Sequence, residues 1–471
     1  MAGIVSCAAY VPLYRLSRAE IAGAWGAAPG RGERAVANHD EDSITMAVAA
    51  ALNCLAGSPK EDLDGVYFAS TTSPYCEKQA AAVVAGALGL GKSVRTADFA
   101  GSLRAGTTAL QAALDAVEAG SARHVLVVCA DSRLCYPRGS NETAFGDGAA
   151  ALLIGRAGPA VTVEGAWSVS EEFYDSWRPE GERFIRTAED RFAREAGYTR
   201  VLPETVKTAM QKYGLPAQEI AKAAFYGPDP RQHSLAAKKL GLEKTQVQDP
   251  LLNDIGNTGC ALPLMILVAA LEEAKAGDRL LLSAYGDGCD VFILRVTGQD
   301  DGIRGRRGIK YYLRNKKSIS YMKYLLWKGL VPTEPPARPP QQMVSVPALW
   351  RDREWGLALR GVRCRNCGTV QFPRQRVCVR CIAGDQFDPY DFAGKTGKIA
   401  SFSHDNLAAA VDPPTTICAV DFPEGGRIMC DMTDRDPEEV KNGLPVEMTF
   451  RKIHTVGGIH NYYWKCMPYR E

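Results

Sequence analysis

The sequence predicts an α/β module over residues 1–300, a zinc ribbon over residues 344–390 and a β-barrel over residues 391–471. Three observations predict this arrangement. Apolar strand-like runs alternate with helical runs in the first part, which is typical of a layered α/β fold. Two Cys-x-x-Cys pairs then follow within residues 364–381. Short β-rich runs separated by glycines complete the chain, and such runs are typical of small barrels.

Composition limits the possible functions. The chain has 471 residues, of which 46% are hydrophobic and 23% are charged, so it is large enough for two or three hydrophobic cores. The formal net charge is only +2, too small to predict binding to nucleic acid or to an anionic membrane. No basic segment precedes the first apolar residues, and we find no apolar run of about 18 residues. We therefore expect a cytoplasmic protein.

The first module is predicted from alternating elements. Ala- and Val-rich strands between helices indicate buried strands. The expected strands are Gly65–Ser70, His124–Ala130, Ala149–Ile154, Ala223–Tyr226 and Arg279–Ser283. The expected helices are Ser43–Ala56, Gln79–Leu88, Thr107–Ala119 and Leu262–Ala276. Glycines gather in loops that precede helices, where α/β folds place their sites.

Residues 301–343 are predicted to link the two parts. The segment Gly302–Lys317 is basic and polar, and the aromatic run Tyr311–Leu330 predicts a helix. Val331–Pro340 is rich in proline, which lacks an amide donor and has a fixed φ, so we expect an extended strap there.

Cysteine spacing predicts a metal site. Cys364 and Cys367 form one Cys-x-x-Cys pair, and Cys378 and Cys381 form a second. Two such pairs can hold four thiolates about 2.3 Å from one tetrahedral Zn²⁺ ion. Four protein ligands leave no open coordination position, so the zinc is expected to be structural.

The C-terminal part, Tyr321–Tyr469, resembles the zinc-ribbon/OB-fold family that accompanies thiolase-type and HMG-CoA synthase-type enzymes. The aromatic helix, the ribbon and the barrel strands follow in that family's order. The expected barrel strands are Gly397–Ser403, Thr416–Asp421, Arg427–Met432, Pro445–Arg451 and Tyr462–Met467. Acidic residues are interleaved with the basic ones in the barrel, which argues against nucleic acid as its ligand.

The N-terminal part resembles HMG-CoA synthase, a member of the thiolase superfamily, from Met1 to about Thr297. The resemblance implies a layered αβαβα module. It rests on segments that match in order, namely His39–Leu52, Ala69–Tyr75, Asp98–Leu110, Ser176–Phe184, Phe225–Leu242, Ile255–Pro263 and Ser283–Gly288.

The groups that do the family's chemistry are mostly absent. The family uses a Cys nucleophile, a Glu that moves a proton, and a His helped by an Asn. Aligned without gaps, the Cys position falls on Leu103, the Glu position on Thr71 and the His position on Tyr226, while Asn257 is retained. Leu cannot act as a nucleophile, and Ser102 beside it would need a neighbouring base.

The resemblance also places Gly286 and Cys289 at the acyl group, together with Thr71, Ser102 and Leu103. The thiols Cys76, Cys260 and Cys289 lie in or beside the matched loops. For each of them a small buried thiol is the alternative to a functional group.

These replacements predict aldol or retro-aldol chemistry on a 3-hydroxyacyl-CoA. Tyr226 would be the acid/base, and Asn257, with backbone amides near Gly286–Gly288, would bind the enolate oxygen. Tyr285 is a second candidate phenol. The resemblance includes thiolase-fold aldolases that use Tyr in place of the usual groups. In the alternative, Tyr226 only packs in the space of the His.

Other functions remain open. They are an HMG-CoA synthase-like acyltransferase, a non-catalytic acyl-CoA-binding or scaffold subunit, and a nucleic-acid-binding barrel, which the charge pattern disfavours. The expected ligands are Zn²⁺ and a coenzyme A thioester. By analogy we expect a homodimer or a larger homo-oligomer, with a thiolase-type protein as a possible further partner.

Overall fold

The computed structural model describes the chain except for residues 299–302, 304–305 and 335–344. Most of the expected Pro-rich strap lies outside the described residues. The chain divides into two compact units. The first contains residues 1–37, 42–82 and 92–324, and the second contains residues 38–41, 83–91 and 325–471.

The first unit is built on one nine-stranded sheet. In spatial order its strands are β11 (Ile220–Phe225), β12 (Arg279–Tyr285), β13 (Gly288–Val296), β8 (Val161–Ser170), β1 (Gly3–Tyr10), β7 (Asp147–Gly155), β6 (His124–Ser132), β4 (Leu63–Ala69) and β5 (Arg95–Phe99). All five strands expected in this module are present. Tyr226, the last residue of one expected strand, lies just beyond the end of β11.

The sheet consists of two halves with the same pairing pattern. In the first half β4 pairs in parallel with β6, which pairs antiparallel with β7, which pairs antiparallel with β1. In the second half β11, β12, β13 and β8 repeat this pattern. Only two residue pairs, Gly3–Thr162 and Ile4–Val161, join β1 to β8. The sequence alone does not display this internal repetition.

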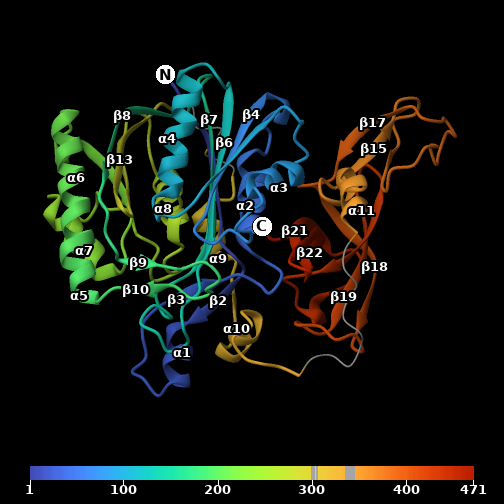
Figure 1. Cartoon of the computed structure of the whole chain (residues 1–471). Coiled ribbons are helices and arrows are strands. Elements are labelled where there is room, and N and C mark those ends of the chain that lie inside the picture. The colour runs from blue at the N-terminus through green and yellow to red at the C-terminus, as the bar shows by residue number, and fades with distance from the viewer. Residues whose placement is uncertain (299–302, 304–305, 335–344) are drawn as a thin grey trace. The chain divides into compact units, whose positions relative to one another are not determined.

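Helices cover both halves and fill the space between them (Figure 1). Among the described residues up to 327, the α-helices are α1 (Arg18–Ala24), α2 (Ser43–Cys54), α3 (Ala80–Ala87), α4 (Ala105–Glu118), α5 (Asp190–Phe192), α6 (Thr199–Lys212), α7 (Pro230–Lys239), α8 (Leu262–Leu271), α9 (Ile309–Arg314) and α10 (Tyr321–Trp327). Helices α4 and α8 pack on each other between the sheet halves, α2 covers β1, β6 and β7, and α6 covers β8, β12 and β13. The predicted αβαβα layering is therefore confirmed.

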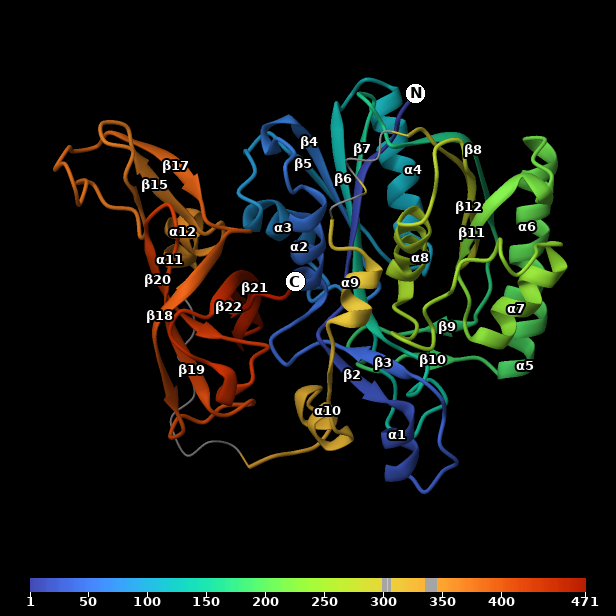
Figure 2. The same cartoon turned by 180° about the vertical axis from the view of Figure 1, so that it is seen from behind.

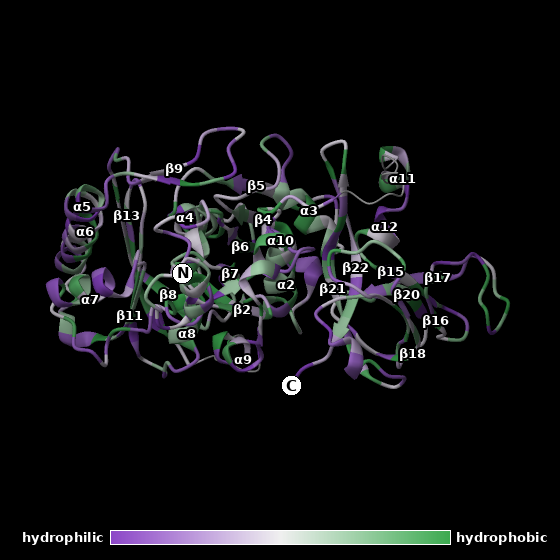
Figure 3. Ribbon diagram, turned by 90° about the horizontal axis from the view of Figure 1, so that it is seen from below, coloured by the Kyte–Doolittle hydropathy of each residue, from purple (hydrophilic) through white to green (hydrophobic). Residues whose placement is uncertain are grey.

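The central layer explains the composition of α8. Every residue from Leu262 to Leu271 is buried, and Figure 3 shows this helix as apolar. A helix that is apolar all round has no polar face to give to solvent and belongs in a core. It ends at Leu271, five residues before the expected end.

The segment predicted to form one aromatic helix is broken. It forms α9 and α10, separated by the short strand β14 (Lys317–Ser318). That strand pairs in parallel with β2 (Tyr14–Ser17), which pairs with β3 (Glu33–Val36). A further two-stranded ribbon joins β9 (Ser176–Trp177) to β10 (Arg186–Thr187).

The second unit contains the ribbon and the barrel (Figure 2). The expected ribbon has β15 (Arg360–Cys364), β16 (Val370–Gln371) and β17 (Phe387–Asp391), preceded by α11 (Val346–Arg351) and α12 (Arg353–Gly356). The barrel is closed in the order β18 (Thr396–Asp405), β19 (Thr415–Asp421), β20 (Arg427–Met432), β22 (Ile459–Pro468) and β21 (Pro445–Val456). A closed five-stranded barrel confirms the predicted OB fold. Among the described residues, no helix is long and apolar enough to cross a membrane.

Candidate functional site

Three predicted site residues and Asp131, which was not predicted, lie at or just beyond the carboxyl ends of strands in the first unit. Thr71 follows β4, Asp131 lies near the end of β6, Tyr226 follows β11 and Tyr285 ends β12. In open α/β sheets, the carboxyl ends of parallel strands gather the loops that bind ligands. The fold therefore brings together groups that are far apart in the sequence.

Tyr226 and Asn257 form a direct hydrogen-bonded pair. The amide of Asn257 donates from Nδ2 to the Tyr226 hydroxyl at 2.9 Å. The backbone N–H of Gly259 donates to Oδ1 of Asn257 at 3.0 Å, which sets the orientation of the amide. Because the Tyr226 oxygen accepts from Asn257, its own proton is available to a third group. Tyr226 and Asn257 are 4% and 3% exposed.

Burial keeps Tyr226 protonated. It raises the pKa of the phenol above its ordinary value, while the positive charge of Arg133 and the hydrogen bond from Asn257 act in the opposite direction. The Tyr198 hydroxyl donates to the backbone carbonyl of Tyr226 at 2.8 Å and so holds the loop behind the phenol. Tyr226 thus keeps its phenolic proton in a fixed position.

A second phenol, Tyr285, lies beside the first. The centroids of the Tyr226 and Tyr285 rings are 6.4 Å apart, and Tyr198 meets both rings edge-on. Burial raises the pKa of Tyr285, and the nearby carboxylate of Asp175, hydrogen-bonded to this phenol, raises it further. Burial also raises the pKa of Asp175, opposed by the hydrogen bond from the Ser176 amide. Tyr285 and Asp175 therefore form a phenol–carboxylate pair.

Leu103 lies where the resemblance places a nucleophile. It precedes α4, and its Cβ is 3.0 Å from the position that a Cβ on Gly286 would occupy. That position is also 2.9 Å from the Ser102 hydroxyl, so only glycine fits at residue 286. The Ser102 hydroxyl accepts a 3.4 Å hydrogen bond from the Arg104 amide, and no His or carboxylate of the described residues bonds to it. A Ser102 nucleophile thus has no base.

One expected oxyanion donor is wrong. The Gly286 amide already donates to the Gly288 carbonyl at 3.0 Å within the tight turn, so it cannot bind an enolate oxygen. The Asn257 side-chain amide has two hydrogens, and only one is donated to Tyr226. The second can still be donated to an enolate oxygen.

Thr71 is held by a buried carboxylate, Asp131. Thr71 donates to Asp131 through its backbone N–H at 2.7 Å and through its hydroxyl at 2.9 Å. Three further donors reach this carboxylate, namely the hydroxyls of Ser70 and Thr72 and the backbone N–H of Cys260. Asp131 is fully buried, so it orders the loops after β4 and before α8.

Two of the three thiols near these loops, Cys260 and Cys289, are buried, which makes them unreactive. Cys289 is fully buried in β13, 3.2 Å from the Ser283 hydroxyl, and burial raises its pKa to about 12. This corrects the expectation that Cys289 contacts substrate, because the thiol belongs to the core beneath Tyr285. Cys260 is likewise buried, with a pKa well above its ordinary value. Cys76 is exposed.

Sequence reasoning missed three members of the site, Asp131, Asp175 and Arg133. Of these three, only Asp175 has a sequence signal that could have revealed it. It directly precedes the matched segment Ser176–Phe184 and is a carboxylate within an aromatic run. Asp131 and Arg133 lie just beyond the predicted strand His124–Ala130, but nothing in the sequence relates them to Thr71 or Tyr226.

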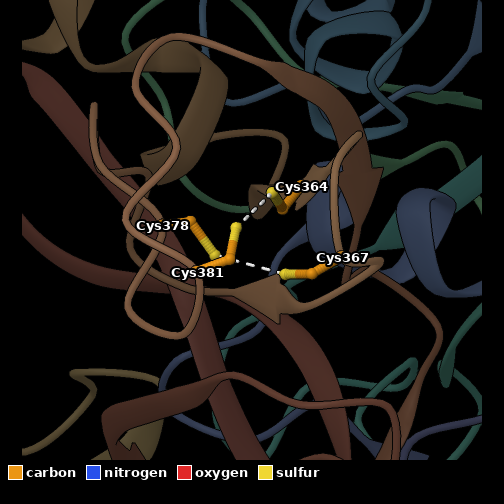
Figure 4. A group of neighbouring side chains, drawn as sticks. All are labelled: Cys364, Cys367, Cys378 and Cys381. Atoms are coloured by element: carbon orange, nitrogen blue, oxygen red, sulfur yellow. Dashed lines mark hydrogen bonds between the residues drawn. The ribbon is translucent and has the colours of Figure 1, made fainter.

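Four cysteines of the ribbon, Cys364, Cys367, Cys378 and Cys381, form the predicted zinc site (Figure 4). Their sulfur atoms all lie within 4.8 Å of one another. The Cys364–Cys381 and Cys367–Cys378 sulfur pairs are 3.6 Å and 3.5 Å apart. A tetrahedron with Zn–S bonds of about 2.3 Å needs S–S distances of about 3.8 Å, so the donor set fits one zinc ion. With four thiolates the zinc is structural.

Three family models match the chain. Residues 97–167 match 3-oxoacyl-[acyl-carrier-protein (ACP)] synthase III. Residues 357–388 match the rubredoxin-like zinc ribbon domain of ChsH2, and residues 390–451 match the C-terminal OB-fold domain of ChsH2.

Solved structures with this fold include an HMG-CoA synthase complexed with CoA, with a TM-score of 0.63 and 21% identity over 69% of this chain and 89% of that one. Another is the 3-oxoacyl-[acyl-carrier-protein] synthase III of Aquifex aeolicus VF5, with a TM-score of 0.53 and 22% identity over 63% of this chain and 100% of that one. At these identities the likeness shows the fold alone.

Curated relatives are closer in sequence. The chain is 34% identical to the hydroxymethylglutaryl-CoA synthase of Pyrococcus horikoshii over 68% of this chain and 94% of that protein. It is 34% identical to the enzyme of Methanosarcina mazei over 70% of this chain and 98% of that protein. These alignments span nearly the whole length of the relatives, and the chain therefore belongs to the hydroxymethylglutaryl-CoA synthase family.

Proposed function

We propose that this protein forms or cleaves the C2–C3 bond of a 3-hydroxyacyl-CoA by aldol or retro-aldol chemistry. The Tyr226–Asn257 pair carries the proposal, because it places a neutral, oriented phenol where the resemblance puts the thioester carbonyl. Leu103 occupies the nucleophile position, so no acyl-enzyme can form there. Retro-aldol cleavage needs proton transfer and enolate stabilisation but no nucleophile.

In the cleavage direction the 3-hydroxyl loses its proton and its oxygen becomes a carbonyl. The C2–C3 bond breaks, and its electron pair moves onto the thioester as an enolate. The enolate then takes a proton at C2, which leaves a shorter acyl-CoA and an aldehyde or ketone. Two groups are needed, a donor at the thioester oxygen and an acceptor at the hydroxyl.

Tyr226 suits the donor role. Its oxygen accepts from Asn257, so its proton points away from the amide, and its burial keeps it neutral. The remaining amide hydrogen of Asn257 would give a second bond to the developing enolate oxygen. Donors of this kind, fixed before the reaction, stabilise charge that forms in the transition state.

Tyr285 and Asp175 suit the acceptor role. Tyr285 is hydrogen-bonded to Asp175, so a proton taken by the phenol oxygen from substrate can pass on to the carboxylate. Burial raises the pKa of Asp175, which makes its carboxylate a stronger base than an exposed one. The Tyr285–Asp175 pair, as proton acceptor, therefore lies beside the Tyr226–Asn257 pair, as proton donor.

The relatives favour a second candidate, an acyltransferase that condenses two acyl-CoA molecules. It would require a nucleophile other than Leu103. A non-catalytic acyl-CoA-binding or scaffold role is a third candidate. We further propose that the protein works as a homodimer or with a thiolase-type partner, as its fold suggests.

Turnover of a panel of 3-hydroxyacyl-CoA thioesters tests the proposal, with products identified by mass. We expect Tyr226→Phe to lower kcat by roughly a hundredfold or more, as loss of a general acid does. Tyr67→Phe is the matched control, since the Tyr67 ring packs on Phe99 and its hydroxyl forms no hydrogen bond with the described residues. It should leave kcat within about twofold of the wild type.

Equal rates for wild type and Tyr226→Phe would sink the assigned role. An acyl adduct in the intact mass after incubation with acetyl-CoA would establish the acyltransferase instead. Activity that appears only after addition of another thiolase-fold protein would establish the scaffold role.

A further inference from the structure

The interior of the barrel contains five neighbouring side chains that carry sulfur, which we call the barrel sulfur cluster. Its members are Cys418 on β19, Cys430 and Met432 on β20, Met448 on β21 and Cys466 on β22. All five are buried, with exposed fractions from 0% to 6%. The chain has only 14 Cys and 10 Met among 471 residues. Apolar packing alone does not account for sulfur at five adjoining core positions, because Val, Leu or Ile would fill them equally well.

Strand pairing brings the barrel sulfur cluster together. Cys418 lies directly opposite Cys430 where β19 pairs with β20. Cys466 on β22 lies opposite Met432 of β20 and opposite Met448 of β21. Facing residues of antiparallel strands have Cβ atoms about 4.5–5.5 Å apart. The backbone therefore fixes where each side chain begins, and one χ1 rotation of each Cys then sets the position of its sulfur.

The sulfur atoms also interact with one another. Cys418 Sγ lies 3.8 Å from Met432 Sδ. Hydrogen bonding to Cys418, then to Cys430, and burial raise the pKa of the Cys466 thiol well above its ordinary value. The hydrogen bond with Cys466 and the positive charge of Arg435 lower the pKa of Cys418, while burial opposes them. Cys466 is therefore the member through which the three thiols are connected.

The donors of the barrel sulfur cluster are thiols and thioethers. Such soft ligands suit copper(I), whereas magnesium, calcium and manganese prefer oxygen donors. Structural zinc takes four Cys or His ligands, and iron–sulfur clusters are held by four Cys. The barrel sulfur cluster offers three thiols together with thioethers, so its donor set fits monovalent copper best.

We propose that the barrel interior binds one copper(I) ion through the thiolates of Cys418, Cys430 and Cys466, with the Met432 thioether as a further ligand. Each thiol loses its proton to solvent as it binds the ion. The ion would connect β19, β20 and β22 from inside the barrel. Because the bound state includes these strands in their folded arrangement, copper(I) should stabilise the barrel.

A positive charge beside the cluster favours the thiolates. Arg435 is 7% exposed, and its Nε donates to the Thr416 hydroxyl at 3.0 Å. Thr416 lies opposite Met432, so the guanidinium is close to the barrel sulfur cluster. Arg435 also forms an ion pair with Asp412 at 2.7 Å, so its charge offsets that of the thiolates only in part.

Anaerobic titration of the zinc-loaded, full-length protein with copper(I), buffered by the chelator bicinchoninate, tests the proposal. We expect metal analysis to find one copper per chain while one zinc stays bound in the ribbon. Cys466→Ala should weaken copper(I) binding by at least about a hundredfold, since loss of even an outer partner of a metal ligand costs roughly 10–100-fold. Met432→Leu keeps the size of the side chain and should weaken binding less than Cys466→Ala does.

Cys129→Ala is the matched control. It removes one thiol of another buried pair, since Cys129 Sγ lies 3.7 Å from Cys260 Sγ in the first unit. This variant should keep the copper(I) affinity of the wild type. If Cys466→Ala fails to fold, Cys430→Ala takes its place, because residue 430 is the most exposed of the three thiols at 6%.

Hydrogen exchange gives a second measure. Copper(I) should slow exchange in peptides from β19, β20 and β22 in the wild type and in Cys129→Ala, but not in Cys466→Ala. Because the barrel thiols are buried, the wild type is also refolded from denaturant in the presence of copper(I).

Copper uptake that releases an equal amount of zinc would place the ion in the ribbon and overturn the proposal. Equal copper(I) affinity of the wild type and Cys466→Ala, or loss of copper binding in Cys129→Ala, would also contradict it. So would a wild type that binds no copper(I) either as the folded protein or after refolding with the ion.

Discussion

Replacing Asp131 with Asn tests whether one buried carboxylate orders the loops of the site. Asp131 accepts five hydrogen bonds, and two of them come from backbone amides, Thr71 N–H to Oδ1 and Cys260 N–H to Oδ2. An Asn side chain has one oxygen and one NH₂ group. Whichever way it turns, its NH₂ faces one of these two backbone donors.

The loss of stability in Asp131→Asn can be worked out from the hydrogen bonds that the Asn side chain cannot accept. One buried N–H loses its acceptor, at about 1–3 kcal/mol, and the bonds that remain lose the strength given by a charged acceptor, at about 1 kcal/mol each. Relief from burying a charge offsets part of this sum. We therefore expect Asp131→Asn to destabilise the loops around Thr71 and Cys260 by about 3–5 kcal/mol, similar to other broken buried charge networks.

Native-state hydrogen exchange with mass spectrometry measures the stability of these loops separately from the rest of the chain. A local measurement is needed because the two units need not unfold together. Peptides that contain Thr71 and Cys260 should exchange about a hundredfold faster or more. Asp115→Asn, at an exposed position of α4, is the control and should leave both peptides unchanged. Exchange within about threefold of the wild type in Asp131→Asn would refute the reasoning.

Four further outcomes are expected. Gly259→Ala should unfold or aggregate on expression, because residue 259 has φ +63° and a Cβ there would clash with Asp131 Oδ2. A variant with the melting temperature of the wild type would contradict this expectation. Leu103→Cys should gain an acetyl adduct from acetyl-CoA in intact-mass spectra, since it restores a thiol before α4, whereas the wild type should gain none. Iodoacetamide at pH 8 should label the exposed Cys76 but not Cys289, whose pKa of about 12 leaves roughly one molecule in ten thousand as thiolate at that pH; peptide mapping decides. Chelation should remove one zinc per chain by metal analysis and unfold residues 357–388 while protected amides of the first unit remain protected; retention of ribbon protection without metal would contradict the structural role.

Much of the fold could be predicted because its signals are local. The spacing of Cys364, Cys367, Cys378 and Cys381 predicts a tetrahedral thiolate site, and the structure brings the four sulfur atoms together as expected. Strands such as β6 and β7 are nearly all buried, so their apolar runs mark them plainly. Helix ends are harder to predict, as at α8, which ends at Leu271 although the residues that follow it are ordinary helix formers.

Site residues could be predicted from the sequence only where they belong to a motif of the family. The resemblance pairs Tyr226 with Asn257, and the structure places the phenol oxygen 2.9 Å from the amide nitrogen. The amide of Gly286 is expected to be available, but a hydrogen bond across its own turn uses it. Cys289 is expected at the substrate, but it is fully buried opposite Tyr285, where β13 pairs with β12.

By itself, the sequence determined the layered α/β module, the ribbon and the barrel, because strand and helix periodicity and metal-ligand spacing are properties of short segments. Only the tertiary structure decided which polar groups meet. Asp131 reaches Thr71 and Cys260, Asp175 reaches Tyr285, and Arg133 lies beside Asn257 without a counter-ion among the described residues. These contacts join strands and loops up to 129 residues apart, and their partners are set by the packing of the sheet halves around α4 and α8 rather than by any local pattern.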